Sequence, residues 1–171
     1  MADTTTLSLL PPPVAPGVSR VSQVEWYGQQ HISPGRSLLA VYGDIYGVSP
    51  EVALRIMGGL SGGLGHTGET CGTVIAAIML LSLKHESSDI NDRDAHTRMV
   101  ALAKQFTDDF RAKYNTVVCR ELIQCDISTP ELYAAARENP HAFDQCFQGG
   151  KAVAELLETK YDILNRKREN T

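Results

Sequence analysis

A short segment in the middle of the chain, residues 58–68 (GGLSGGLGHTG), contains six of its fourteen glycines. Each glycine inside a helix costs roughly 1 kcal/mol of stability relative to alanine, so we expect a loop here. Directly after it, residues 74–83 (VIAAIMLLSL) are almost entirely apolar, which predicts a buried central helix. This run is too short to cross a membrane, because a spanning helix needs about 20 apolar residues.

One start signal for a helix, a hydroxyl residue followed by proline, occurs three times in the chain. Serine and threonine cap helix N-termini, and proline suits the first helical position. The signal occurs at Ser33-Pro34, Ser49-Pro50 and Thr129-Pro130, and it predicts helices ending near Gly47, Gly58 and Asn139.

Two longer helices are predicted from apolar residues spaced three and four apart, over residues 92–114 and 141–166. A shorter amphipathic helix is expected over residues 19–30, and no segment alternates with period two. We therefore predict an all-α fold of six or seven helices around one core, with residues 19–171 as a single domain. Residues 1–18, with four prolines, are expected to form a flexible tail that docks on a partner.

The charge balance argues against nucleic acid as a ligand. The chain has 20 acidic residues against 16 lysines and arginines, and no basic cluster to neutralise phosphates. The early sequence also lacks the charged and apolar regions of a signal peptide, so we expect a cytoplasmic protein. Four cysteines are few for a disulfide-stapled secreted domain, which favours thiols or metal ligands. A homo-oligomer is expected for a helical protein of this size.

Within the glycine segment, residues 63–68 match the dinucleotide-binding pattern G-x-G-x-x-G. That pattern binds phosphates only when it follows a strand in a βαβ unit, whereas here it follows a predicted helix. Nucleotide binding is therefore disfavoured. Gly65, Gly68 and Gly72 remain candidate positions for the close approach of a cofactor, and Gly72 could equally admit another backbone.

The cysteines differ in their surroundings. Cys71 is expected in the first turn of the helix after the glycines, where free N–H groups and the helix dipole favour a thiolate. The alternative is that Cys71 is a small buried residue. Cys119 and Cys125 would face apart on one continuous helix, so only a break after residue 125 could bring them together. Cys146 lies on the apolar stripe of the last helix, which by itself indicates core packing.

Taken together, residues 58–83 and the segment 119–131 (CRELIQCDISTPE) resemble the C_GCAxxG_C_C family of redox-active proteins over residues 20–160. Three family cysteines correspond to Cys71, Cys119 and Cys146. The motif after Cys71 departs from the family, with Thr73 in place of alanine and Ala76 in place of glycine. The first family cysteine falls at about Ser33 or Pro34, where this chain has no thiol.

The resemblance implies a helical redox protein that uses its cysteines in one of two ways. In the first, they hold an iron–sulfur cluster for electron transfer, which usually takes four thiolates. Cys71, Cys119, Cys125 and Cys146 would supply them, with Cys125 replacing the missing cysteine and His31 as another replacement ligand. Zinc would accept the same four thiolates.

In the second, Cys71 is the nucleophile of a dithiol/disulfide pair, and Cys119 or Cys146 is the resolving cysteine. His66, five residues before Cys71, would then raise its thiolate fraction. Either use requires a redox partner protein, and the chain would be an oxidoreductase or an electron carrier. The competing hypothesis is a non-catalytic binding or assembly module that lost redox activity with its first cysteine.

Overall fold

The computed structural model describes residues 10–139 and 141–166, and it confirms the all-α prediction. Within these ranges there are nine α-helices and no strand. The number exceeds the predicted six or seven because α4 (Ser61–Leu64) and α7 (Cys119–Ile123) are only four and five residues long. Helices of about one turn are too short to show an apolar periodicity in the sequence.

The other helices are α1 (Val21–Gln29), α2 (Pro34–Tyr42), α3 (Pro50–Ile56), α5 (Gly72–His85), α6 (Arg93–Tyr114), α8 (Pro130–Glu138) and α9 (Asp144–Thr159). Two 3-10 turns, η2 (Gly43–Tyr46) and η3 (Gly58–Leu60), follow α2 and α3. None of the helices in the described ranges is long and apolar enough to cross a membrane.

All three serine-proline or threonine-proline signals open a helix as predicted. The Ser49 hydroxyl accepts a hydrogen bond from the Val52 N–H, and the Thr129 hydroxyl accepts one from the Leu132 N–H. The side chain of Ser33 makes no such bond at the start of α2, although proline still occupies the first position of that helix.

The last helix, α9, ends at Thr159 rather than at the predicted residue 166. The residues that follow it form hydrogen bonds with a buried lysine instead of continuing the helix. Lys84 on α5 is 3% exposed, and its ammonium group donates to the Tyr161 carbonyl at 3.0 Å and to the Asp162 carbonyl at 2.5 Å. Because these carbonyls bond to Lys84, the segment after α9 is fixed against α5 in a non-helical conformation.

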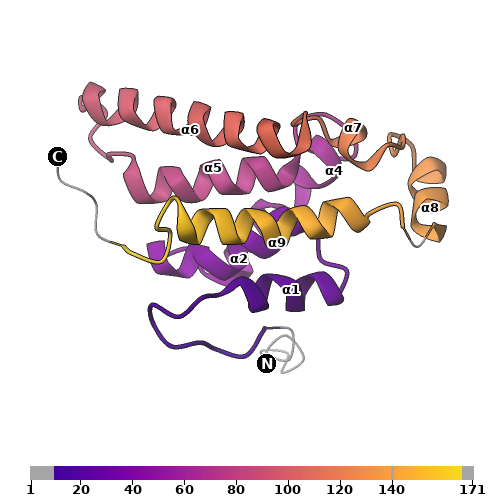
Figure 1. Ribbon diagram of the computed structural model, residues 1–171, viewed down its shortest axis with the longest axis horizontal. Helices are drawn as coiled ribbons and strands as arrows, with labels where there is room; N and C mark the ends of the chain where they lie inside the picture. Colours follow the sequence, from indigo (N-terminus) through magenta and orange to yellow (C-terminus); the bar gives the residue numbers. More distant parts are fainter. Residues whose placement is uncertain (1–9, 140, 167–171) are drawn as a thin grey trace.

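The main core forms around α2 and α5. Helix α2 packs against α1, α3, α5 and α9, and eight of its nine residues are buried. In Figure 1, α5 lies between α6 and α9, and the long helices run side by side along the longest axis of the molecule. The fully buried Leu38 and Leu39 of α2, Leu80 and Leu81 of α5, and Leu157 of α9 belong to this core.

A second, smaller hydrophobic cluster lies at one end of the helix bundle, where α7, α8 and the start of α9 meet (Figure 1). Its buried members are Cys119, Ile123, Ile127 and Ala136, with Cys146 packed against them. Cys71 belongs to the main core. Cys71, Cys119 and Cys146 therefore lie where the main core and the second cluster adjoin.

The sequence predicted a loop over the whole glycine segment. This prediction is wrong in part, because the segment contains η3 and α4. Helical geometry is broken inside α4 by Gly62 and Gly63, both with positive φ. Of the predicted tail, residues 1–9 lie outside the described ranges. Residues 10–18 have no helix, and the Gln23 side chain donates to the Pro12 carbonyl at 2.6 Å.

Candidate thiol site

Two of the cysteines are brought together by a short backbone pairing between segments far apart in the sequence. Thr70 and Val118 form an isolated antiparallel bridge. On either side of it, the Cys71 N–H donates to the Val117 carbonyl at 2.8 Å, and the Cys119 N–H donates to the Glu69 carbonyl at 2.6 Å. The starts of α5 and α7 are thereby held next to each other.

Gly63 makes this pairing sterically feasible. It has a φ of +68°, and its carbonyl accepts a hydrogen bond from the Glu69 N–H at 3.1 Å. A Cβ at this position would lie 2.6 Å from the Glu69 nitrogen and 2.7 Å from the Cys119 Cβ. Only glycine provides both this backbone conformation and this clearance.

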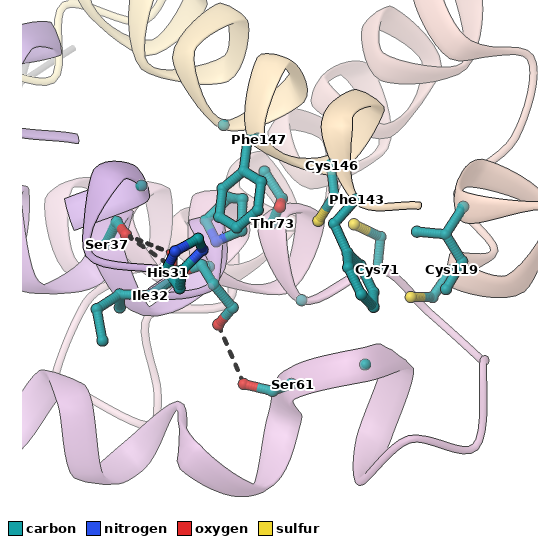
Figure 2. Close-up of a pocket in the computed structure, with 18 of the residues that line it drawn as sticks. His31, Ile32, Ser37, Ser61, Cys71, Thr73, Cys119, Phe143, Cys146 and Phe147 are labelled. Carbon is teal, nitrogen blue, oxygen red and sulfur yellow. Dashed lines mark hydrogen bonds between the residues drawn. The ribbon is translucent and has the colours of Figure 1, made fainter. Parts of the chain in front are cut away.

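Cys146 on α9 completes a group of three thiols at one cavity. Cys71, Cys119 and Cys146 all border a cavity of about 860 Å³, and all three also border a neighbouring void of about 20 Å³. Cys71 and Cys119 are each 6% exposed, whereas Cys146 is half-buried. In Figure 2 the sulfur atoms of Cys71 and Cys146 point toward each other, and Cys119 lies beside Cys71.

Two of these thiols are strongly biased toward the protonated form. Burial raises the pKa of Cys119 to about 12, with further contributions from Cys71 and Cys125. Burial also raises the pKa of Cys146, again with contributions from the neighbouring Cys71 and Cys119. An anionic sulfur is costly in such an environment, so both remain thiols at neutral pH.

Cys71 occupies the N-cap position of α5, one residue before the helix begins rather than in its first turn. Its carbonyl accepts the Val74 N–H at 3.0 Å, and its side chain makes no capping hydrogen bond. The sulfur is thus left to face the cavity, at the end of a 14-residue helix whose dipole favours negative charge.

Cys125 does not border the cavity, although it lies near enough to Cys119 to contribute to the raised pKa of that thiol. The helix breaks before Cys125 rather than after it as predicted, because α7 ends at Ile123 and Gln124 adopts a left-handed conformation. The half-buried side chain of Cys125 packs against the second cluster. Burial, with Asp126 nearby, raises the pKa of its thiol.

A metal centre on the four cysteines finds no support in this arrangement. In the part of the chain that the structure describes, no three histidine, cysteine or carboxylate side chains form a group that could hold a metal ion. Three thiols border the cavity and Cys125 does not, so they do not form the four-thiolate shell expected for a cluster or for zinc. The iron–sulfur cluster therefore stays a prediction.

Both histidines considered from the sequence border the cavity. His31 is exposed on the turn between α1 and α2, and His66 comes from the glycine segment. The His66 ring packs on the ring of Tyr133, with 4.2 Å between their centroids. This contact joins the glycine segment to α8 at the wall of the cavity.

Of the three candidate glycines, only Gly72 borders the cavity. A Cβ on Gly72 would lie 2.9 Å from the Leu60 carbonyl oxygen, so the group that approaches closely there is another stretch of backbone. Gly68 instead packs against Arg120, and Gly65 has the Gly59 carbonyl as its nearest neighbour. Cofactor binding at these glycines stays a prediction.

Ser33, Ser61 and Thr73 also border the cavity, and their hydroxyl groups were not among the site residues predicted from the sequence. The Ser33 and Ser61 oxygens lie 3.1 Å apart (Figure 2). Ser33 and Pro34, where the resemblance puts the first family cysteine, both face this cavity.

Comparisons with known proteins agree with the motifs. The chain matches the family model described as "Putative redox-active protein (C_GCAxxG_C_C)" over residues 35–160. Searches of curated proteins and of solved structures found no match. Because the matched segment covers well over half of its length, the chain belongs to the C_GCAxxG_C_C family.

Proposed function

We propose that this protein performs thiol–disulfide exchange, with Cys71 as the nucleophile and Cys146 as the resolving cysteine. The observation that supports the proposal most directly is the pair of sulfurs that point toward each other at the wall of one cavity (Figure 2). A disulfide requires only two cysteines whose Cα atoms lie within about 7 Å, so no metal shell is needed.

The surroundings of the two cysteines support different roles for them. Cys71 makes no capping hydrogen bond at the start of α5 and faces the cavity, so its sulfur is free to attack a disulfide that enters there. Cys146 is kept protonated by burial and by its neighbours, as suits a thiol that reacts second. Cys119 is also kept protonated by burial, and it is the alternative resolving cysteine.

The exchange balances in two steps. The Cys71 thiolate attacks one sulfur of a substrate disulfide, forming a mixed disulfide and releasing the other substrate sulfur as a thiolate. Cys146 then attacks the Cys71 sulfur, and its proton passes to the second departing substrate sulfur. Two protein thiols are oxidised to a disulfide, and one substrate disulfide is reduced to two thiols. A dithiol reductant, a protein or a small molecule, would restore the starting state.

The cavity is large enough to admit a small organic disulfide. Its volume of about 860 Å³ falls within the range of roughly 300–1,000 Å³ that is usual for small-molecule sites. Exposed side chains at its edge, including those of Gln29, Arg137 and Lys151, show that it opens to solvent. A reducing compartment such as the cytoplasm would keep the thiols ready for a further turnover.

The proposal is tested by mixing the reduced protein with hydroxyethyl disulfide and following adducts by intact-protein mass spectrometry. The wild-type protein should lose two thiols without retaining an adduct. Cys146→Ser should accumulate the mixed disulfide on Cys71, and Cys71→Ser should not react at the cavity. Cys125→Ser is the matched control and should behave as wild type, because Cys125 does not border the cavity.

Two results would overturn the proposal. If Cys71→Ser still lost two thiols at the wild-type rate, Cys71 would not be the nucleophile. If Cys119→Ser rather than Cys146→Ser trapped the mixed disulfide, the assignment of the resolving cysteine would be wrong.

A further inference from the structure

A threonine hydroxyl without a partner lies at the cavity, at the start of α5. Thr73 is 3% exposed, and its side chain makes no hydrogen bond with any residue in the described ranges. Thr73 borders both the cavity and the neighbouring void, and Figure 2 draws its side chain among the residues that line the cavity. A nearly buried hydroxyl without a partner costs stability unless a ligand or water bonds to it.

Two backbone donors accompany this hydroxyl. The N–H groups of Gly72 and Thr73 are the first two of α5, and neither finds a hydrogen-bond acceptor in the described part of the chain. The N-cap side chain of Cys71, which could have accepted one of them, makes no capping bond. Free N–H groups at the positive end of a 14-residue helix are a favourable setting for an anion.

The carboxylates that also border the cavity do not occupy this position. Glu25 is paired with Lys151 at 2.7 Å, and Asp144 is paired with His141 at 2.8 Å. All four of these side chains are exposed, so the two pairs lie at the edge of the cavity. The negative charge that the start of α5 favours is therefore not supplied by these side chains.

We propose that the start of α5 is an anion subsite that binds the carboxylate of a small thiol-reactive substrate. Thr73 donates its hydroxyl to this carboxylate, and the N–H groups of Gly72 and Thr73 contribute two more donors. Since Cys71 directly precedes them, a substrate held in this way presents its reactive atom to the Cys71 sulfur. The inference deepens the proposed exchange by naming its substrate class, small disulfides with a carboxylate near the sulfur.

The test uses two alkylating agents that differ in one group and that react without any redox step. Iodoacetate and iodoacetamide both transfer a two-carbon unit to a thiolate and release iodide, but only iodoacetate has a carboxylate. The rates at Cys71 and Cys125 are measured in the same reduced protein by peptide mass spectrometry. Cys125 is the internal reference, because it does not border the cavity that contains the subsite.

In the wild-type protein, the ratio of the iodoacetate rate to the iodoacetamide rate should be at least about tenfold higher at Cys71 than at Cys125. A hydrogen bond to a charged group contributes about that factor. Thr73→Val, which keeps the shape and removes the hydroxyl, should lower the ratio at Cys71 by about tenfold. Thr73→Ser, which keeps a hydroxyl, should have the wild-type ratio at Cys71. Neither variant should change the ratio at Cys125.

Equal ratios at Cys71 and Cys125 in the wild-type protein would overturn the subsite, as would a Thr73→Val variant with the wild-type ratio. A Thr73→Val variant that slowed both reagents equally would also contradict it, because the hydroxyl would then act on Cys71 alone.

The same protein should exchange with dithiodiglycolate faster than with hydroxyethyl disulfide. If the alkylation ratios hold and neither disulfide is reduced, the subsite stands and the proposed exchange fails. If both disulfides react and the ratios do not differ, the exchange stands and the subsite fails.

Discussion

Replacing Gly63 with alanine should destabilise the protein far more than replacing Gly65 with alanine. Gly63 and Gly65 have almost the same backbone conformation, with φ of +68° and +65°. Alanine loses about 1–2 kcal/mol in this left-handed region, and both variants suffer that loss. Around Gly65, the nearest atom to a new Cβ is the Gly59 carbonyl oxygen at 3.8 Å, an ordinary contact. Gly65→Ala should therefore lower the free energy of unfolding by about 1–2 kcal/mol and no more.

At Gly63, a steric term is added to the backbone term. The new Cβ would lie 2.6 Å from the Glu69 nitrogen and 2.7 Å from the Cys119 Cβ, so backbone or the start of α7 must move. Overpacking of this kind costs about 1–3 kcal/mol, which gives a total of about 2–5 kcal/mol for Gly63→Ala. The displacement should also expose Cys119 and increase its rate of alkylation.

Urea denaturation followed by circular dichroism measures both variants, with equal m-values as the check that the two transitions are comparable. If Gly63→Ala and Gly65→Ala had equal free energies of unfolding, the close packing of the glycine segment against Cys119 would be refuted. The same conclusion would follow if Cys119 in Gly63→Ala were alkylated at the wild-type rate.

Two further predictions concern buried polar groups. Lys84→Met removes the ammonium that bonds to the Tyr161 and Asp162 carbonyls, so the free energy of unfolding should fall by about 2–3 kcal/mol. Amide exchange over residues 161–164 should quicken, and an unchanged exchange rate there would argue against Lys84 as their anchor. Because the pKa of Cys119 is raised from 9.0 to about 12, the native state holds this proton more tightly than the unfolded chain. Its contribution to stability is complete below pH 9 and is lost as pH rises towards 12, with a slope of up to about 1.4 kcal/mol per pH unit. Cys119→Ala should flatten this decline in urea titrations, and an unaltered slope would contradict the burial of the thiol.

Much of the fold follows from local signals in the sequence. Proline after a hydroxyl residue fixes where α2, α3 and α8 begin, because the proline constrains its own backbone and needs no N–H partner. The apolar spacing of α6 likewise reflects a face that must be buried. The central place of α2 does not follow from such signals, since its burial depends on four neighbouring helices.

The site was predictable in its members and not in its geometry. The cysteines and their family motif named Cys71, Cys119 and Cys146 as a group, and these three do share a cavity. The pairing of Thr70 with Val118 joins Cys71 to Cys119, and the packing of α9 adds Cys146; no spacing in the sequence encodes either contact. For the same reason, the position of Cys125 outside the cavity and the unpartnered Thr73 hydroxyl became visible only in three dimensions.

Peptide mapping of the oxidised protein tests the central claim most directly. After exposure to excess hydroxyethyl disulfide, tandem mass spectrometry should find one disulfide, between Cys71 and Cys146, with Cys119 and Cys125 as free thiols. A disulfide that includes Cys125, or four free thiols after complete exposure, would contradict the account.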